Sequence, residues 1–103
     1  NKVLDTIKKN YTNANYGVDE FVTDMGMSRS LLYKKIQSLT GIPIGEMLRN
    51  YRLNIAKEIL SGRSGMTLNI SEVAYQVGFN DPKYFTRCFT KHFKMSPSKF
   101  IRK

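Results

Sequence analysis

Hydrophobic residues recur every three or four positions along most of the chain, which is the spacing of one face of an α-helix. This pattern predicts helices near residues 3–14, 18–25, 28–40, 44–60 and 70–77, and further helices from residues 82 and 97 onward. It also assigns Leu4 and Leu39 to buried faces, and residues 61–68 to an exposed loop. We therefore expect an all-α fold.

Part of the apolar pattern is repeated along the chain. At an offset of 52 positions the matched residues are Val18, Phe21, Val22, Met25 and Gly26 against Ile70, Val73, Ala74, Val77 and Gly78. In the helix that follows, the offset becomes 53, with Leu32 matching Phe85 and Ile36 matching Phe89, so the second turn carries one extra residue. Because so many matched types at a constant spacing are hard to obtain by chance, we interpret the chain as a duplicated unit.

Each unit has a short helix, a glycine turn and a second helix with a polar outer face. Gly78 can take the positive φ that a sharp turn needs. Ser28 is expected to cap the second helix of the first unit, and Asn80 or Asp81 that of the second unit, where Pro82 suits the first turn. This arrangement is typical of a helix-turn-helix.

A long helix expected from Ile44 to Leu60, about 25 Å in length, separates the two units. Its apolar residues form two stripes, which consist of Ile44, Leu48, Tyr51, Ile55 and Ile59 on one side and Leu53, Ala56 and Leu60 on the other. We expect this helix to pack against both units. Ser96 is expected to cap a last short helix in which Phe100 and Ile101 fold back onto the second unit.

Charge narrows the class of partner. The chain has 103 residues with 17 Lys and Arg against 8 Asp and Glu, a net charge of +9, which favours an anionic partner such as nucleic acid. Basic ribosomal and membrane-surface proteins share this balance. No apolar run approaches the roughly 18 residues of a membrane span and no leader opens the chain, so we expect a soluble, cytoplasmic protein. A start at Asn1, without methionine, suggests a piece of something longer.

Motifs for chemistry are absent from the sequence. It has no glycine-rich phosphate loop, no paired catalytic carboxylates and no nucleophile–base set, so we expect no enzyme. Cys88 and His92 stand four residues apart, but two ligands do not make a zinc site. We therefore expect no metal and no cofactor, and the single cysteine fits a reducing compartment.

Several motifs together carry a family resemblance. They are Val22-x3-Gly26, Arg49-x2-Arg52-Leu53-x2-Ala56, Ala74-x3-Gly78-Phe79-x-Asp81-x2-Tyr84-Phe85-x-Arg87-x-Phe89 and Ser96-Pro97. With these motifs the chain resembles the DNA-binding domain of AraC/XylS-type transcription regulators over essentially its whole length. Residues 28–36, 76–85 and 93–97 look most like the C-terminal output domain of hybrid two-component regulators. In two places the chain departs from the pattern, since Lys94 stands where many relatives have Gly, and Val22 replaces the usual Ala.

The resemblance implies seven helices in two homeodomain-like helix-turn-helix lobes, with a rigid linker helix that sets two recognition helices into neighbouring major-groove segments. We expect the lobes at residues 1–42 and 62–103 and the linker helix at 43–61. The expected function is sequence-specific binding of double-stranded DNA as the output domain of a transcription regulator. RNA polymerase is an expected partner, and dimerisation is expected through regions outside this fragment.

The expected DNA contacts lie on the outer faces, ends and flanks of the recognition helices. They are Ser28, Arg29, Ser30, Tyr33, Lys34, Asp81, Pro82, Lys83, Thr86, Arg87, Thr90, Lys91 and Lys94. Lys34, Lys83 and Arg87 can donate to guanine, although each has the alternative of being solvated charge. Ser30, Tyr33, Pro82 and Thr86 match family positions that face bases, and the helix-end residues suit the phosphate backbone.

Alternatives remain for three groups. Arg49 and Arg52 are most simply ion-pair partners for carboxylates of the lobes, with a phosphate contact as the other option. Four phenylalanines offer either a stacking platform for single-stranded nucleic acid or, as their shared helical face favours, a core; they are Phe85, Phe89, Phe93 and Phe100. The rival function is a basic helical module for RNA or a protein partner.

Overall fold

The computed structural model describes residues 1–62 and 69–101. These residues form an all-helical fold with seven helices, as predicted. The helices are α1 (Lys2–Asn10), α2 (Val18–Met25), α3 (Arg29–Thr40), α4 (Ile44–Ser61), α5 (Ile70–Gln76), α6 (Pro82–Phe93) and α7 (Pro97–Ile101). Most of the loop predicted over residues 61–68 lies outside the described residues, and Ser61 still belongs to α4. Among the described helices, none is long and apolar enough to cross a membrane.

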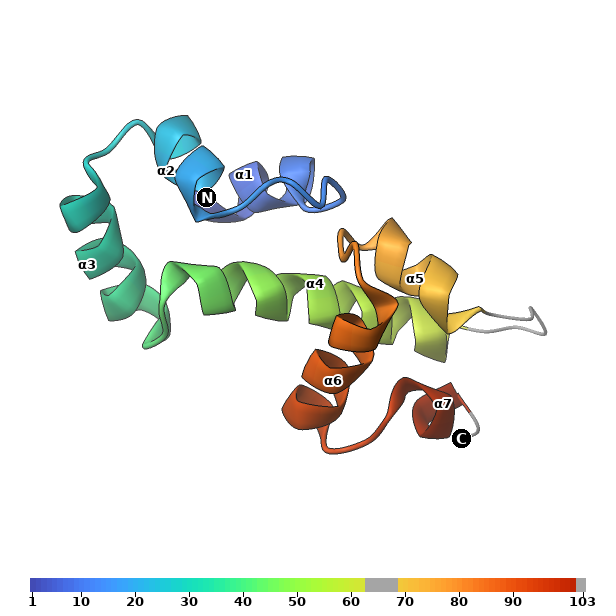
Figure 1. The fold of residues 1–103 in the computed structure, drawn as a ribbon. Coiled ribbons are helices and arrows are strands. Elements are labelled where there is room, and N and C mark those ends of the chain that lie inside the picture. Colours follow the sequence, from blue (N-terminus) through green and yellow to red (C-terminus); the bar gives the residue numbers. More distant parts are fainter. Residues whose placement is uncertain (63–68, 102–103) are drawn as a thin grey trace.

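Helix α4 runs along the middle of the molecule, which measures 45 × 24 × 23 Å. Helices α1, α2 and α3 surround its first half, and α5, α6 and α7 surround its second half (Figure 1). Each half has its own hydrophobic core, which confirms the two predicted lobes. The first core contains Val3, Ile7, Tyr16, Phe21, Met25, Leu32, Ile36, Ile44 and Leu48, and the second Leu53, Ala56, Leu60, Val73, Ala74, Val77, Phe79, Phe85 and Phe89.

The apolar residues of α4 divide between the lobes by position along the helix. Tyr51 packs against the first core, whereas every buried residue from Leu53 onward belongs to the second. Ile55 and Ile59, which the sequence places on one stripe with Ile44, also pack against the second core. Periodicity shows which face of a helix is apolar, but the neighbour that covers the face changes here between Tyr51 and Leu53.

The duplication is confirmed at the level of helix ends. Helices α3 and α6 each contain 12 residues, and α6 starts and ends 53 positions after α3. Ser28 caps α3 by accepting a hydrogen bond from the Leu31 N–H at 3.2 Å. Asp81 caps α6 by accepting bonds from the N–H groups of Lys83 at 3.0 Å and Tyr84 at 3.4 Å. The caps stand 53 positions apart, like the helices that they start.

The C-terminal ends of these helices also correspond. Gly41 ends α3 in the left-handed conformation with φ of 76°, and Lys94 ends α6 in the same conformation with φ of 62°. Lys94 is the non-glycine residue with positive φ among those described. The presence of Lys94 where many relatives have Gly therefore strains the backbone, because the left-handed conformation costs an L-residue about 1–2 kcal/mol.

Glycines at the two turns both have positive φ, as predicted for Gly78, but their surroundings differ. Gly26 has φ of 69°, and a Cβ atom placed there would meet no atom within 4 Å. Gly78 has φ of 96°, and its Cβ would stand 2.0 Å from the carbonyl oxygen of Tyr11 and 2.7 Å from Nε of Arg52. The second turn therefore needs glycine for a further reason, which is the close approach of the first lobe.

Arg52 fastens the segment between α1 and α2 at this approach. Its Nε donates to the carbonyl oxygen of Tyr11 at 2.9 Å, and one terminal nitrogen donates to those of Asn13 at 3.0 Å and Tyr16 at 2.9 Å. Among the described residues it forms no ion pair with a carboxylate, so that expectation was wrong. Burial lowers the pKa of Arg52, but an arginine stays charged at physiological pH. We call Arg52, these three carbonyls and Gly78 the Arg52 junction.

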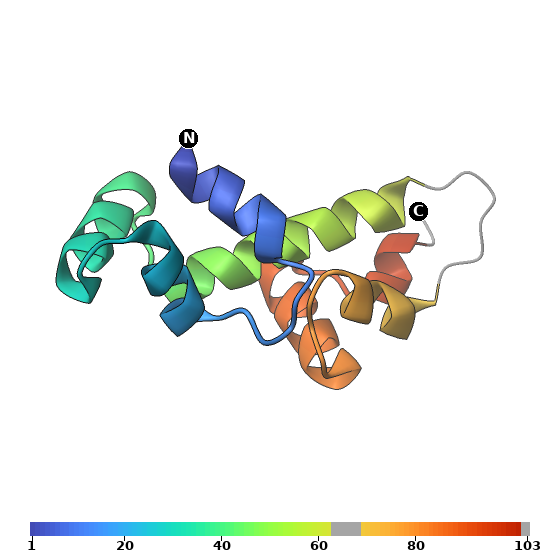
Figure 2. The same ribbon diagram turned by 90° about the horizontal axis from the view of Figure 1, so that it is seen from above.

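Tyr16 also anchors the segment between α1 and α2. Its ring is buried in the first core, and its hydroxyl donates to a carboxylate oxygen of Asp24 at 2.8 Å. Burial, reinforced by this hydrogen bond, raises the pKa of the Tyr16 hydroxyl, so the group stays protonated. The segment and the turn between α5 and α6 lie side by side in both views (Figure 2).

Several residues of the first lobe lie closer to solvent than predicted. Helix α1 ends at Asn10 instead of reaching Ala14, which is exposed. Leu4 and Leu39 are also exposed, by 53% and 62%. Each flanks a stripe that is buried, but the described elements provide no further helix to cover the flank. A lobe of three short helices and half of α4 can bury only one narrow stripe of each helix.

The phenylalanines of the second lobe belong to its core, which confirms that interpretation over a stacking platform. Phe85 and Phe89 are fully buried, and Phe93 and Phe100 pack against them from the edge. Phe100 is held there by α7, which begins as predicted with Ser96 accepting a hydrogen bond from the Lys99 N–H at 3.2 Å. Ile101 is 38% exposed and adds little to this packing.

Candidate nucleic-acid interface

Helix α3 presents a polar face because two buried side chains fix its orientation. Leu32 and Ile36 are fully buried in the first core. The candidate residues of this lobe therefore turn outward, and all are exposed: Ser28, Arg29, Ser30, Tyr33 and Lys34. The face combines two cationic side chains with short hydroxyl groups and one aromatic ring.

Helix α6 is held in the same way by Phe85 and Phe89. Its exposed candidates are Asp81, Lys83, Arg87, Thr90, Lys91 and Lys94, while Pro82 and Thr86 are half-buried. Pro82, Lys83 and Thr86 line a hollow of about 400 Å³ on one flank of α6. A second hollow, whose α6 lining includes Arg87 and Lys91, lies on the other flank. The exposed part of α6 therefore forms a ridge between two depressions.

Three candidate side chains form hydrogen bonds with backbone groups of the protein. The hydroxyl of Ser28 and the carboxylate of Asp81 cap their helices, and the Thr90 hydroxyl donates to the Thr86 carbonyl at 2.7 Å. The carboxylate of Asp81 would also repel a phosphate. Asp81 thus positions α6, and its direct contact with DNA remains a prediction.

Arg29 is paired with Asp19 of α2 on the surface. The hydrogen bond to Asp19 raises the pKa of Arg29. Both side chains are well exposed, by 50% and 80%, and such surface pairs contribute only about 0–1 kcal/mol. The pair therefore orients the guanidinium without preventing it from moving to a phosphate.

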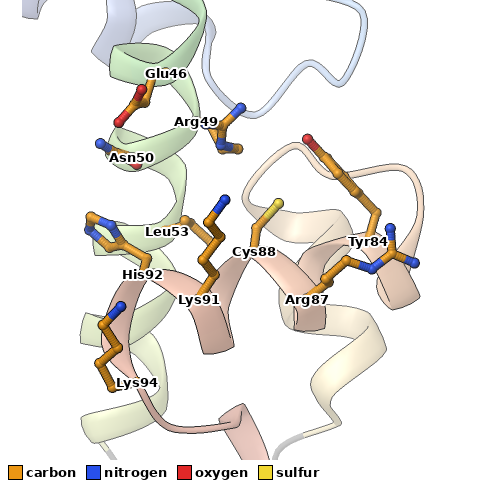
Figure 3. Close-up of a pocket in the computed structure, with 10 residues that line it drawn as sticks. All are labelled: Glu46, Arg49, Asn50, Leu53, Tyr84, Arg87, Cys88, Lys91, His92 and Lys94. Carbon is orange, nitrogen blue, oxygen red and sulfur yellow. The ribbon is translucent and has the colours of Figure 1, made fainter. Parts of the chain in front are cut away.

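A basic hollow lies between α4 and α6 and has a volume of about 530 Å³ (Figure 3). We call it the α4–α6 hollow. Its lining includes Glu46, Arg49, Asn50 and Leu53 from α4 and Tyr84, Arg87, Cys88, Lys91, His92 and Lys94 from α6 and its cap. It brings together three candidates, Arg87, Lys91 and Lys94, with Arg49, for which the sequence left a phosphate contact as the second option. Cys88 and His92 line it too, but the described residues contain no group of three potential metal ligands.

Arg49 differs from Arg52 although the two share α4 three residues apart. Arg49 is half-buried and forms no hydrogen bond or ion pair within the described ranges, so its expected carboxylate partner is not found. The available signal in the sequence was the i, i+3 spacing, which puts both side chains on one side of the helix. Spacing alone does not show that the chain covers only one of them.

Curated proteins similar to this chain include transcriptional regulators and a histidine kinase. Over 99 residues the chain is 35% identical to histidine kinase P4 of Formosa agariphila, covering 96% of this chain and 7% of the kinase. It is 33% identical over 96 residues to an uncharacterised HTH-type transcriptional regulator in the cgkA 5' region of Pseudoalteromonas carrageenovora, covering 93% of this chain and 54% of that protein. The chain thus spans a small part of the first relative and about half of the second.

Solved structures share the fold. The C-terminal domain of the two-component response regulator yesN from Fusobacterium nucleatum superposes with a TM-score of 0.84 at 26% identity, covering 97% of this chain and 94% of that one. The family model described as a helix-turn-helix domain matches residues 21–103, which include the last five residues of α2, all of α3 to α7 and both turn glycines. The chain therefore belongs to the helix-turn-helix domain family of AraC/XylS type.

Proposed function

We propose that this chain binds double-stranded DNA sequence-specifically, as the DNA-binding domain of a transcription regulator. One observation carries the proposal: two equivalent 12-residue helices, α3 and α6, expose polar and cationic faces and are fixed to one continuous helix. Membership of the helix-turn-helix family and the net charge of +9 support it.

The dimensions suit two successive major-groove segments. Helix α4 has 18 residues, which is about 27 Å at 1.5 Å per residue. Successive major-groove segments on one face of B-DNA lie about 34–36 Å apart, and the molecule is 45 Å long. A major groove about 12 Å wide accepts an α-helix, so α3 and α6 enter neighbouring segments from one side of the duplex.

The residues divide by role in this proposal. Lys34, Lys83 and Arg87 face bases, and Arg87 is the best suited to a bidentate contact with guanine because its fork matches O6 and N7. Arg29, Lys91 and Lys94 contact phosphates. The remaining candidates complete the reading faces or hold the two helix N-termini in place; they are Ser28, Ser30, Tyr33, Asp81, Pro82, Thr86 and Thr90.

The proposal extends to the protein around this domain. Lobes at residues 1–42 and 62–103, joined by a linker at 43–61, act as the output domain of a hybrid two-component regulator. The match of nearly the whole chain to a small part of a histidine kinase supports this context. RNA polymerase is a proposed partner, dimerisation is assigned to regions outside the fragment, and the domain itself has no enzymatic role.

A competition experiment tests the function. We expect labelled duplex DNA in a mobility-shift assay to be displaced by unlabelled duplex far better than by single strands or structured RNA. Hydroxyl-radical footprinting on a duplex selected from a random library should then show one continuous site of about 15–20 base pairs, since two segments one helical turn apart are covered. Preferential displacement by RNA, or a footprint half as long, would refute the proposal.

A further inference from the structure

Three basic side chains project from α4, and two of them have partners within the protein. Arg52 donates to three backbone carbonyls at the Arg52 junction. The ammonium group of Lys57 lies 4.9 Å from the centre of the Phe93 ring, a cation–π distance. Arg49, the third, has no such partner among the described residues.

Arg49 lies where α4 passes from one lobe to the other. It lines the α4–α6 hollow and also a smaller hollow of about 240 Å³ beside Gly78, Phe79 and Asn80. In Figure 3 the Lys91 side chain extends from α6 toward Arg49 on α4. Two cations from different helices therefore face one open space.

The charge of the α4–α6 hollow favours an anion. Arg49, Arg87, Lys91 and Lys94 line it, whereas Glu46 is the acidic residue among its described lining. An anion in the hollow would reduce the repulsion between these like charges. A phosphodiester suits a guanidinium because two parallel N–H groups of the guanidinium can donate to the phosphate oxygens.

The position of the hollow identifies the source of that phosphate. Its α6 wall carries Arg87 and Lys91, which form one flank of the proposed reading helix. Its other wall is α4, which leads to the lobe of α3. When α6 enters one major-groove segment, the hollow faces the DNA strand that borders this segment on the side toward α3.

We propose that Arg49 binds a backbone phosphate in the stretch between the two major-groove segments, so that the linker helix itself contacts DNA. This inference rests on the proposed function. It adds a contact that is independent of sequence, because phosphates are alike at every step.

Salt dependence of binding tests the contact with two variants and a control. Arg49→Ala removes the charge and Arg49→Lys keeps it. Lys8→Ala removes one exposed charge from α1, a helix that lies on the opposite side of α4 from α6 (Figure 1). Binding of the 103-residue chain is measured on a random-sequence 30-base-pair duplex and on a duplex selected with the wild type. Circular dichroism melting of each variant shows that it is folded.

For Arg49→Ala we expect a loss of affinity on both duplexes and a salt slope smaller by about 0.9, the value for one phosphate. Its affinity loss at 50 mM salt should then be about three-fold larger than at 200 mM salt, because that slope acts over a four-fold change in concentration. Arg49→Lys should retain most of the wild-type slope, and Lys8→Ala should behave like the wild type.

Neutral phosphates locate the contact. Single methylphosphonate substitutions are placed along the selected duplex, and one of them, between the two protected major-groove segments, should weaken the wild type but not Arg49→Ala. An unchanged slope for Arg49→Ala, or equal effects of every methylphosphonate on both proteins, would overturn the inference while the wild type still binds. Failure of the wild type to bind any duplex would instead overturn the proposed function and the inference with it.

Discussion

The two turn glycines provide a matched pair for testing how the lobes are joined. Gly26→Ala and Gly78→Ala make the same chemical change at equivalent positions, and both residues have positive φ. The left-handed conformation costs an alanine about 1–2 kcal/mol, partly offset by about 0.4–1 kcal/mol from the lower entropy of the unfolded chain. Since a Cβ on Gly26 meets no atom, we expect Gly26→Ala to lose about 1 kcal/mol of unfolding free energy.

Gly78→Ala adds a collision to the same backbone cost. Its Cβ would stand 2.0 Å from the carbonyl oxygen of Tyr11, and a backbone atom cannot rotate out of the way. Either the segment after α1 or the turn after α5 must move, and the hydrogen bonds of Arg52 to this segment are then weakened. Hydrogen bonds to charged groups contribute about 1.5–3 kcal/mol each, so we expect a total loss of about 3–5 kcal/mol.

Urea and thermal unfolding of both variants measure the difference. For a domain of this size about 1 kcal/mol shifts Tm by about 4–8 °C, so Gly78→Ala should melt at least about 10 °C below Gly26→Ala. It should also lengthen or weaken the protected stretch in a footprint, because the lobes no longer share one arrangement. Equal losses for the two variants would refute the conclusion that the Arg52 junction joins the lobes.

Three further results are expected. In a mobility-shift titration Arg87→Ala should weaken binding to a selected duplex ten-fold or more, since about 1.4 kcal/mol is a factor of ten, and leave binding to a random duplex almost unchanged. Lys91→Ala should weaken binding to both duplexes alike. Equal losses on both duplexes for Arg87→Ala would show that Arg87 contacts a phosphate. Binding should fall with salt at a slope near −5 in a plot of log K against log salt if about six phosphates are neutralised, and a slope near zero would mean that the basic face does not meet DNA. Lys94→Gly should raise the unfolding free energy by about 0.5–1 kcal/mol in urea, because glycine relieves the left-handed strain, with Gly41→Lys as the reciprocal change that should lower it.

The sequence was sufficient to predict the elements and their duplication. Apolar spacing located the described helices except α7, whose start was predicted from Ser96 and Pro97. The cap Ser28 was recognisable, and Asp81 was one of two candidates with Asn80, because few residue types accept hydrogen bonds from free N–H groups. The offset of 53 also survives in the structure, down to the left-handed ends at Gly41 and Lys94. These features depend on local geometry, which a few neighbouring residues determine.

Features that depend on distant neighbours were predicted less well. The sequence placed Leu39 on a buried face, but no described element covers it. It treated Arg49 and Arg52 alike, although the carbonyls that bind Arg52 come from residues about 36–41 positions earlier. Carbonyl groups leave no mark in a sequence, since every residue has one. For the same reason the sequence did not reveal that the carbonyl of Tyr11 approaches Gly78, although it did predict the positive φ of Gly78.

The change of neighbours along α4 between Tyr51 and Leu53 has a consequence for how such a domain can diverge. Each residue inserted at this point would turn the second lobe by about 100° about the helix axis and move it by about 1.5 Å. An insertion of three or four residues would roughly restore the direction of α6 but displace it by about 5 Å, more than the 3.4 Å rise of one base-pair step. Because of the pitch of α4, insertions in this helix cannot change the distance between α3 and α6 on DNA in small steps. Relatives that read wider or narrower spacings have to change the surfaces of the lobes instead of the length of the helix.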